Sequence, residues 1–329
     1  MIPKEESIVF LEADSLSKCY HSKVKKPIYA VNQVSFSIRQ GETLGLVGES
    51  GCGKSTLGKL LLNLEQPSDG QVRFCGEEIS SYSFRRMRPI RKDMQMVFQN
   101  SAHSFNPYLT VKQIIQEPLD NFGRYTKEEK HQKVVEILDK VGLDESYQFR
   151  YSGELSGGQR QRVGIARAFV LNPKFVVCDE AVSALDYAVR NKILNLLTDL
   201  KEEQQSTYLF ISHDLSAVRQ VCDRVIVMYM GQIMEILPSL DEGQFHHPYT
   251  KALLAAALSP NPRNRNEKKV LFRECEDDMP PKEGCMFQNR CLYVEEKCRK
   301  EKPPLFSSSS KDGTYCVACH FCKQKIKDI

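Results

Sequence analysis

The feature of this sequence with the clearest chemistry is a run of glycines followed by a lysine and two hydroxyl residues. Residues 48–56 read Gly-Glu-Ser-Gly-Cys-Gly-Lys-Ser-Thr and fit the phosphate-binding pattern G-x-x-x-x-G-K-[ST]. Glycines let backbone N–H groups turn toward phosphate oxygens, Lys54 can bridge the outer phosphates, and the Ser55 hydroxyl can ligate Mg²⁺. The predicted nucleotide ligands in this loop are Gly48, Ser50, Gly51, Cys52, Gly53, Lys54, Ser55 and Thr56.

The flanking residues supply the elements that such a loop needs. Thr43–Val47 is apolar enough for a short buried strand, and Leu57–Leu64 has the pattern of an amphipathic helix. The positive end of that helix's dipole would point at the bound anion. Strand, loop and helix together predict a nucleotide site in an α/β fold.

A second glycine segment, Leu155–Gln159, precedes a predicted helix over Val163–Val170. A serine and two glycines at a helix start form another anion site, for the same reasons as the first. One triphosphate does not need two such sites in one chain. We therefore expect Ser156, Gly157, Gly158 and Gln159 to close on a nucleotide held by another subunit.

Polar side chains also follow three predicted buried strands. Phe175–Glu180 ends in two acids, of which Asp179 is expected to hold Mg²⁺ and Glu180 to polarise water. His213 follows the strand Tyr208–Ile211 and can hydrogen-bond a terminal phosphate. Gln99 ends the strand Met94–Phe98; it is either an Mg²⁺ or water ligand in the crevice or a solvated loop residue.

Other segments of the N-terminal and central sequence indicate how the domain is organised around the nucleotide site. Tyr20 precedes the phosphate loop and is either an adenine-stacking aromatic or a packed strand-end residue. From Thr110 the apolar spacing becomes helical, as in Lys127–Val141, which indicates a helical subdomain inserted in the sheet. Its approach, residues 101–108, is either a partner-contact surface or a solvated loop. A helix over Ala188–Lys201 follows Asp186.

Composition excludes several classes. The chain has 329 residues and a formal net charge of +4, which is too small to indicate nucleic-acid binding. No apolar run approaches the length of a membrane span, and the N-terminus lacks a secretory signal pattern, so we expect a cytosolic protein. Of its 12 cysteines, those from Cys275 onward crowd the tail, which favours a metal site over disulfides in a reducing compartment.

Together these motifs resemble the ATPase subunit of an ABC transporter. The loop at 48–56 matches Walker A, and Leu155–Gln159 matches the LSGGQ signature without change. Val176–Glu180 matches Walker B, although Ala181 stands where relatives commonly carry proline. The Q-loop of the family corresponds to Gln99, and its D-loop corresponds to Ser183–Asp186. The switch histidine corresponds to His213, and the adenine-stacking aromatic corresponds to Tyr20.

The resemblance covers roughly the first 260 residues and implies a P-loop fold with a RecA-like core, an antiparallel β subdomain and a helical subdomain at about residues 101–170. It also implies a head-to-tail dimer in which each ATP lies between Walker A of one subunit and the signature of the other. Glu180 would be the general base, His213 would hold the γ-phosphate, and Gln99, Ser55 and Asp179 would hold Mg²⁺. Asp186 would lie at the nucleotide.

The tail narrows the subfamily. Residues 247–254, His-Pro-Tyr-Thr-Lys-Ala-Leu-Leu, are similar to the segment after the ATPase core in peptide and nickel importers. The Cys-rich extension, residues 261–329, resembles the same subfamily, whose four-cysteine site implies a 4Fe–4S cluster on Cys285, Cys291, Cys298 and Cys319. Four thiolates suit Zn²⁺ as well, Cys316 and Cys322 compete for the fourth position, and free thiols in a loose tail are the remaining alternative.

The expected function is therefore ATP hydrolysis that powers peptide import. The resemblance implies a second, homologous ATPase subunit, two transmembrane permease subunits and an extracytoplasmic binding protein, with this chain on the cytoplasmic face of the membrane. The nearest alternative is the same machine importing nickel or a metal chelate. Alternatives of another class are a soluble, non-transport ABC ATPase and a redox or iron sensor that gates the ATPase.

Overall fold

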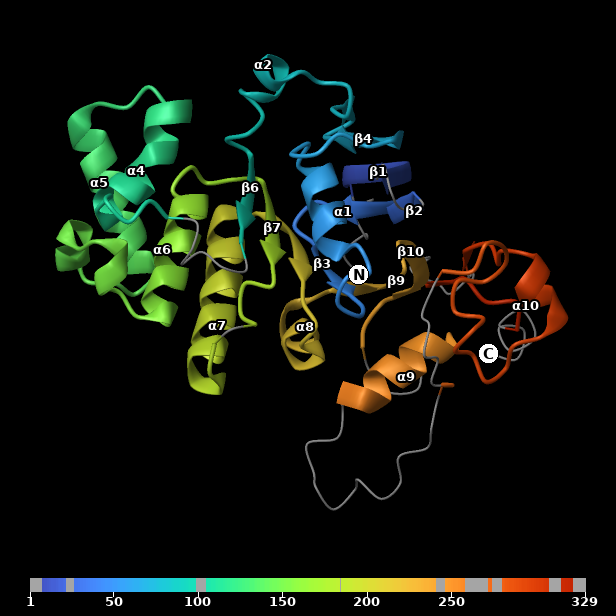
Figure 1. Ribbon diagram of the computed structural model, residues 1–329. Coiled ribbons are helices and arrows are strands. Elements are labelled where there is room, and N and C mark those ends of the chain that lie inside the picture. Colours follow the sequence, from blue (N-terminus) through green and yellow to red (C-terminus); the bar gives the residue numbers. More distant parts are fainter. Residues whose placement is uncertain are drawn as a thin grey trace, which may run out of the picture.

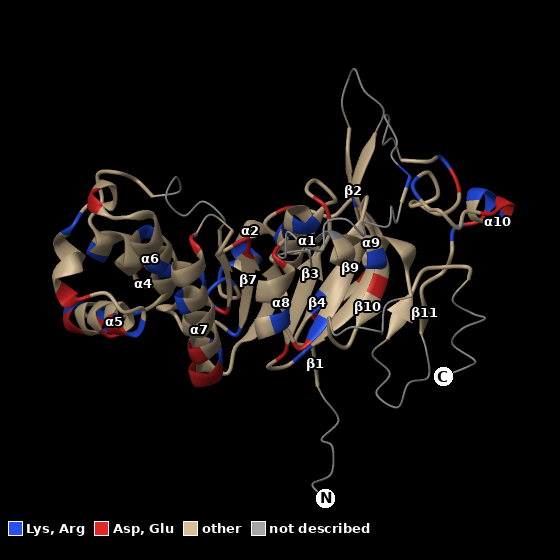
Figure 2. Ribbon diagram, turned by 90° about the horizontal axis from the view of Figure 1, so that it is seen from below, with Lys and Arg blue, Asp and Glu red and all other residues tan. Residues whose placement is uncertain are grey.

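The computed structural model describes residues 8–21, 27–98, 105–183, 185–240, 246–257, 272–273, 280–307 and 315–321. Two sheets form the middle of the molecule. A group of helices lies at one end and the C-terminal segment at the other, as both ribbon views show (Figures 1 and 2). This is the α/β arrangement that the sequence predicts.

The larger sheet carries the core. In spatial order its strands are β11 (Phe306–Ser307), β12 (Cys316–Val317), β10 (Gln232–Leu237), β9 (Arg224–Tyr229), β3 (Thr43–Val47), β8 (Thr207–Ile211), β7 (Phe175–Asp179) and β6 (Met94–Val97). The strands from β9 to β6 are parallel, and β10, β12 and β11 add to one edge in antiparallel register. Every residue of β3, β7 and β8 is buried, which explains their continuous apolar sequences.

The two faces of this sheet belong to different cores. Phe175 and Val177 of β7 pack on one face with α1 (Lys54–Leu61), whereas Val176 and Cys178 pack on the other. The second face is shared with α7 (Tyr187–Gln204) and α8 (Leu215–Val221). Alternation along a strand therefore places helices on both sides, and the parallel strands are covered completely.

A four-stranded antiparallel sheet covers α1 from outside. Its order is β2 (Ile28–Arg39), β1 (Val9–Tyr20), β4 (Asp69–Phe74) and β5 (Glu77–Glu78). Its buried side chains join those of α1 in one cluster, so α1 lies between the two sheets. The small helix α2 (Phe84–Met87) follows before β6.

The predicted helical subdomain consists of α4 (Val111–Phe122), α5 (Lys127–Lys140), two 3₁₀ turns (Glu145–Phe149 and Ser152–Glu154) and α6 (Gly157–Phe169). Thr110 and Thr126 begin α4 and α5 with capping boxes, in which the threonine hydroxyl and the residue three positions later satisfy each other's backbone N–H. In the C-terminal segment, α9 (Pro248–Ala257) and α10 (Glu296–Lys300) flank the cysteine-bearing turns.

Two helix starts differ from the prediction. The helix α1 begins at Lys54 rather than Leu57, and α6 begins at Gly157 rather than Val163. In both cases the anion-binding motif itself forms the first helical turn. Apolar periodicity cannot reveal such a turn, because glycine and polar residues occupy it.

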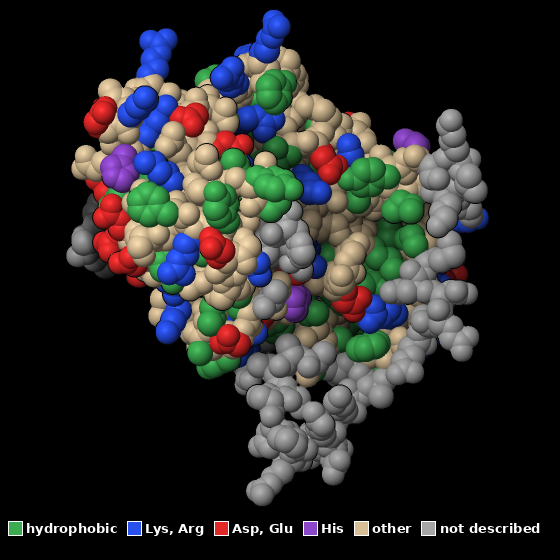
Figure 3. Space-filling model, turned by 60° about the vertical axis from the view of Figure 1, so that its left-hand side comes forward, with side chains coloured by type: hydrophobic (Ala, Val, Ile, Leu, Met, Phe, Trp, Pro, Cys, Tyr) green, Lys and Arg blue, Asp and Glu red, His purple; other side chains and the backbone are tan. Residues whose placement is uncertain are grey.

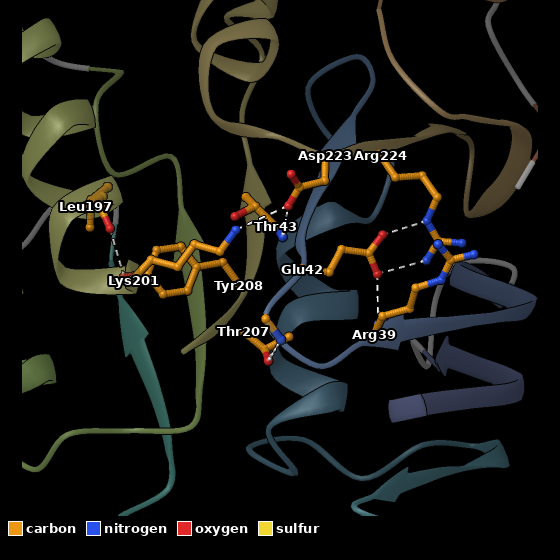
Figure 4. A network of polar contacts seen from close by, with 10 residues as sticks. Arg39, Glu42, Thr43, Leu197, Lys201, Thr207, Tyr208, Asp223 and Arg224 are labelled. Carbon is orange, nitrogen blue, oxygen red and sulfur yellow. Dashed lines mark hydrogen bonds and ion pairs between the residues drawn. The ribbon is translucent and has the colours of Figure 1, made fainter. Parts of the chain in front are cut away.

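The amino-terminal ends of the parallel strands are joined by a polar network that is buried at Glu42 and Arg224 and exposed at Asp223 (Figure 4). Arg224 donates to both carboxylate oxygens of Glu42, at 2.7 and 3.2 Å, and Glu42 also accepts the Arg39 N–H at 2.8 Å. Asp223 accepts from the Thr43 N–H at 2.7 Å and from Lys201 at 3.2 Å. These contacts join the end of β2 to the starts of β3 and β9 and to α7.

Candidate functional site

The phosphate loop leaves β3 at the carboxyl end of the sheet and leads into α1. Gly48 and Gly53 adopt φ values of 152° and 105°. A Cβ on Gly48 would lie 2.1 Å from the carbonyl oxygen of Met228, and a Cβ on Gly53 would lie 1.9 Å from that of Ala30. Both glycines are therefore required by close backbone approach, which fixes the path of the loop.

Lys54 is folded into this loop. Its Nζ donates to the carbonyl oxygens of Gly48 and Glu49, both at 2.8 Å, and its side chain is buried. The two carbonyl acceptors carry no net charge, so these hydrogen bonds do not cancel the positive charge of the ammonium. The loop therefore presents a positive centre at the start of α1, as a phosphate site requires.

Ser55 connects the phosphate loop to the acidic strand end. Its hydroxyl donates to Oδ1 of Asp179 at 3.0 Å, across 124 residues of sequence. Burial raises the pKa of Asp179, and the bond from Ser55 acts in the opposite direction. One hydroxyl and one carboxylate at this spacing are hard oxygen ligands of the kind that Mg²⁺ prefers.

Glu180 faces a different neighbour. Its Oε1 lies 3.4 Å from Nδ1 of His213, and the His213 side chain is exposed. The Glu180 backbone is in the left-handed region at φ 47°, where its N–H donates to Ile211 and its carbonyl accepts from the Ser183 hydroxyl. This uncommon conformation directs adjacent acids to different partners, Asp179 to Ser55 and Glu180 to His213.

Tyr20 lies beside α1, the helix that follows the phosphate loop. Its hydroxyl hydrogen-bonds the carboxylate of Glu65 and contacts Thr56, and its pKa is raised first by burial and then by the Glu65 bond. The residue is still 43% exposed. The ring therefore flanks the first turn of α1, and adenine stacking stays a prediction.

The signature residues lie apart from the phosphate loop. Ser156 begins α6, where its hydroxyl accepts the Gln159 N–H at 3.3 Å and the Gln159 side chain accepts the Ser156 N–H at 2.8 Å. A Cβ on Gly157 would meet no atom within 4 Å, whereas one on Gly158 would lie 3.0 Å from Val189. Strands β6 and β7 separate α6 from α1 in Figure 1, so the chain does not bring its two anion sites together.

Two further predicted residues have other outcomes. The Asp186 carboxylate accepts the Val189 N–H at 2.9 Å and so caps α7. Gln99 and Ala184 lie outside the described residues. The D-loop is therefore described only in part, and the Q-loop glutamine not at all.

Four tail cysteines line one small pocket. They are Cys285, Cys291, Cys298 and Cys319, and the pocket is also lined by His247 and His320. Cys316 is elsewhere, on β12 near Ser307, and Cys322 lies outside the described residues. Burial raises the pKa of the Cys285 thiol to about 12 and that of Cys291 in the same direction, so metal binding would have to displace these protons. Among the described residues, no three Cys, His, Asp or Glu side chains are grouped for a single metal ion.

Sequence reasoning missed two contacts between the tail and the phosphate loop. Arg290 forms a bidentate ion pair with Glu49, and the Tyr249 hydroxyl accepts the Glu49 N–H. The partners are 241 and 200 positions apart. No motif spacing signals contacts of that range, so only the fold reveals them.

The described helices include none that joins sufficient length to sufficient apolar character to span a bilayer. Acidic and basic residues are interspersed along the described ribbon (Figure 2), in agreement with the small net charge.

Comparison with known proteins agrees with this geometry. The family model described as "ABC transporter" matches residues 31–183, and the one described as "Oligopeptide/dipeptide transporter, C-terminal region" matches residues 242–298. The oligopeptide transport ATP-binding protein AppF of Bacillus subtilis is 46% identical over 298 residues, which cover 89% of each chain. OppF of Haemophilus influenzae, which carries the same description, is 39% identical over 323 residues, covering 94% of this chain and 96% of OppF.

Solved structures give the same answer for the fold. The ATP-binding cassette MJ0796, in a dimeric post-hydrolysis state with ADP and Pi, has a TM-score of 0.65 at 30% identity. The match covers 69% of this chain and 98% of that one. The predicted P-loop ABC fold is thereby confirmed. From its motifs, its geometry and these relatives, the chain belongs to the ABC transporter family, as an ATP-hydrolysing ATP-binding subunit with the C-terminal region of the oligopeptide/dipeptide branch.

Proposed function

We propose that this chain binds and hydrolyses ATP to drive the import of peptides through a membrane permease. One observation carries the catalytic part: Lys54, the Ser55–Asp179 contact and the Glu180–His213 pair all lie at the carboxyl end of the parallel strands. The C-terminal family match and the relatives described as oligopeptide transport proteins support peptides as the cargo.

Each residue has a role in the hydrolysis step. Lys54 and the loop N–H groups hold the β- and γ-phosphates, and Tyr20 stacks on the adenine. Ser55 and Asp179, with Gln99, would hold Mg²⁺, which would neutralise phosphate charge. Glu180 accepts a proton from the attacking water while the water oxygen forms a bond to the γ-phosphorus. The bond to the β–γ bridging oxygen breaks, ADP and phosphate leave, and His213 holds the γ-phosphate in place.

The signature supports a head-to-tail dimer. Because Ser156, Gly157, Gly158 and Gln159 lie away from the phosphate loop of their own chain, they are positioned to complete a partner's site. Asp186, in the D-loop three positions after Ser183, is assigned to the same interface. We propose a homologous second ATPase subunit as the partner, in a heterodimer.

Chromatography tests the dimer. With ATP and Mg²⁺, the Glu180→Gln variant should elute as a dimer, because its ATP remains uncleaved. Where the dimer requires the second ATPase subunit, that subunit is added to the sample. Adding Ser156→Arg should abolish association and leave ATP binding unchanged. Association that survives Ser156→Arg would refute this arrangement.

A surface groove between the sheet and the helical subdomain is the proposed permease contact. It is lined by Leu62, Met96, Phe98, Phe105, Pro118 and Phe122, with Arg91 and Arg167 also in the lining. Figure 3 turns this helical side forward and shows apolar side chains scattered among charged ones. The lining also includes Glu117, which pairs with Arg167 at 2.9 Å. A groove with apolar and charged groups fits a short amphipathic permease segment on the cytoplasmic face of the membrane. Phe122→Asp should abolish transport and spare ATP binding.

Uptake of a labelled tripeptide by cells that lack the chromosomal copy tests the cargo. Uptake should return with the wild-type gene and not with Lys54→Ala. An extracytoplasmic binding protein would select the peptide, so the same cells are also tested with nickel. Restored nickel uptake without peptide uptake would favour the metal-importing alternative.

For residues 261–329 we propose a C-terminal extension that holds a 4Fe–4S cluster on Cys285, Cys291, Cys298 and Cys319, with Zn²⁺ as the alternative. Residues 1–260 then form the ATPase domain. Four thiols around one pocket support this proposal. Among the described residues, no three ligand side chains are grouped around one point. This arrangement counts more against a single Zn²⁺ than against a 4Fe–4S cluster, because each iron of a cluster takes only one thiolate and the four thiols can lie farther apart.

Anaerobic purification with iron and zinc analysis tests the tail. Iron with visible absorption, both lost in Cys285→Ser, supports a cluster; colourless zinc supports a structural clip; neither metal refutes both. ATPase activity that is equal with and without the metal would refute the sensor alternative.

A further inference from the structure

The C-terminal segment holds Glu49 of the phosphate loop through two residues, Arg290 and Tyr249. Arg290 donates to both carboxylate oxygens, at 2.8 and 2.9 Å. Tyr249, on α9, accepts the Glu49 backbone N–H at 3.0 Å. The same peptide group and the one after it are also held by Lys54, which donates to the carbonyls of Gly48 and Glu49.

Both contacting residues are fixed by aromatic packing. The Arg290 guanidinium lies 4.7 Å from the ring centre of Phe272 and 5.7 and 5.8 Å from those of Tyr229 and Phe287. Tyr249 is fully buried against Tyr229 and Phe287, at centroid distances of 4.7 and 5.4 Å. Rigid, planar groups of this kind lose little freedom when they hold a partner. The contacts therefore act as a preformed brace.

This brace is continuous with the cysteine-lined pocket. Phe287 lies between Cys285 and Arg290 in the chain, lines that pocket and packs on Tyr249. The Cys291 N–H donates to the Phe287 carbonyl at 3.0 Å, and the Arg290 N–H donates to it at 3.2 Å. A single turn thus carries two of the pocket thiols and the arginine that reaches the loop.

The charge of Glu49 gives the brace an electrostatic task. Glu49 is itself a residue of the phosphate loop, and its backbone carbonyl accepts from the Lys54 ammonium at 2.8 Å. The Glu49 carboxylate therefore places a negative charge within the loop. An unpaired carboxylate there would repel a triphosphate, and Arg290 neutralises it.

We propose that Arg290 and Tyr249 are positioning residues for the phosphate loop: through Glu49 they hold its first peptides and cancel its negative charge, so that the C-terminal segment sets the affinity for ATP. This inference rests on the proposed ATP hydrolysis. It assigns the C-terminal segment a function in the nucleotide site that does not depend on the metal content of the pocket.

The test measures binding of a fluorescent ATP analogue with Mg²⁺ to the full chain. Arg290→Gln should weaken binding on the order of tenfold, the scale expected when a partly buried, bidentate charged hydrogen bond beside an anion site is lost. In the double variant Glu49→Gln/Arg290→Gln the repulsive charge is absent as well, so affinity should return to within about threefold of wild type. With the whole transporter, Arg290→Gln should raise KM for ATP and leave kcat nearly unchanged.

Two further variants test whether a change in affinity comes from these contacts. Tyr249→Phe removes only a hydroxyl, retains the ring packing and should weaken binding by about threefold; it remains informative even where Arg290→Gln does not fold. Lys300→Gln is the matched control, because Lys300 pairs with Glu296 on the exposed surface of α10 and should leave affinity unchanged.

The outcomes separate the two proposals. If wild type does not bind the analogue, the proposed function fails. If wild type binds it and Arg290→Gln or Tyr249→Phe binds equally well, or if the double variant does not recover, the brace is refuted while the ATPase assignment stands.

Discussion

The two ends of the parallel sheet use charged residues in opposite ways. At the amino-terminal end, Glu42 and Arg224 are buried and paired within the chain. At the carboxyl end, Asp179 and Glu180 are adjacent acids, and the charge of Glu180 adds to the effect of burial in raising the pKa of Asp179. Charges with internal partners hold the strands in register, whereas like charges placed together store repulsion that a cation and a substrate relieve.

The largest expected effect comes from a substitution at the carboxyl end of the sheet, which should change catalysis and not stability. Glu180→Gln should lower ATP turnover by about 10²–10⁴-fold, because the group that accepts the water proton is lost. The free energy of unfolding should stay close to wild type or rise, since a repulsive charge is removed. Single-turnover hydrolysis and urea denaturation measure the two quantities. A large loss of stability with retained turnover would reverse our assignment of the two ends.

The matching change at the amino-terminal end should act on stability instead. Arg224→Ala leaves Glu42 buried without its ion-pair partner and should lower the free energy of unfolding by about 3–5 kcal/mol. Replacing both residues, as Glu42→Leu/Arg224→Met, should recover much of that loss. Urea denaturation provides the measurement, and KM for ATP serves as the control because it should not change.

A pH series extends the comparison to the buried His247, whose Nδ1 accepts the N–H of Tyr249, a residue that contacts the phosphate loop. Burial lowers the pKa of His247 from 6.5 to about 3. Below pH 6.5 the unfolded chain binds a proton that the folded chain refuses, so acid destabilises the fold by about 1.4 kcal/mol per pH unit between roughly pH 6 and 4. His247→Gln should flatten this slope; denaturation curves that fall equally in both proteins would contradict it.

The smallest effect separates capping from catalysis at Asp186. Asp186→Ala should cost about 1 kcal/mol of stability because the Val189 N–H loses its cap, while Asp186→Asn should cost less. Both variants should reduce the ATPase rate of the assembled dimer if the carboxylate also lies at the interface. Thermal melts and turnover of the two variants, measured side by side, distinguish a cap alone from a cap with a second role.

Much of this could be predicted, because some signals are local. The strand Thr43–Val47 was predicted with its observed bounds, since a fully buried parallel strand is a continuous apolar run between polar residues. The start of α6 was placed six residues late, because a capping serine and two glycines resemble a loop when only propensity is considered. The Ser156/Gln159 capping box was the available signal.

Other features could not be predicted because they depend on distant chain segments. The Ser55–Asp179 contact agrees with two separate motifs, each of which assigns its residue to the same Mg²⁺. The Glu49–Arg290 pair has no such motif, and Arg290 stands in a cysteine-rich stretch that directs attention to metal chemistry. The addition of the tail strand β12 to the edge of the core sheet, beside β10, has no local sequence signal either.

Gly157 is surrounded by open space in this chain, and its φ is not in the left-handed region. The fold of one subunit therefore gives no reason for a glycine there, and alanine should make the isolated chain more stable by up to about 1 kcal/mol. Under the dimer proposal, the empty volume belongs to a neighbour's nucleotide, and the same methyl group would occupy it. Selection acting on a single subunit for thermal stability would thus erode the assembly, and a stabilised Gly157→Ala chain that no longer associates on ATP would be its signature.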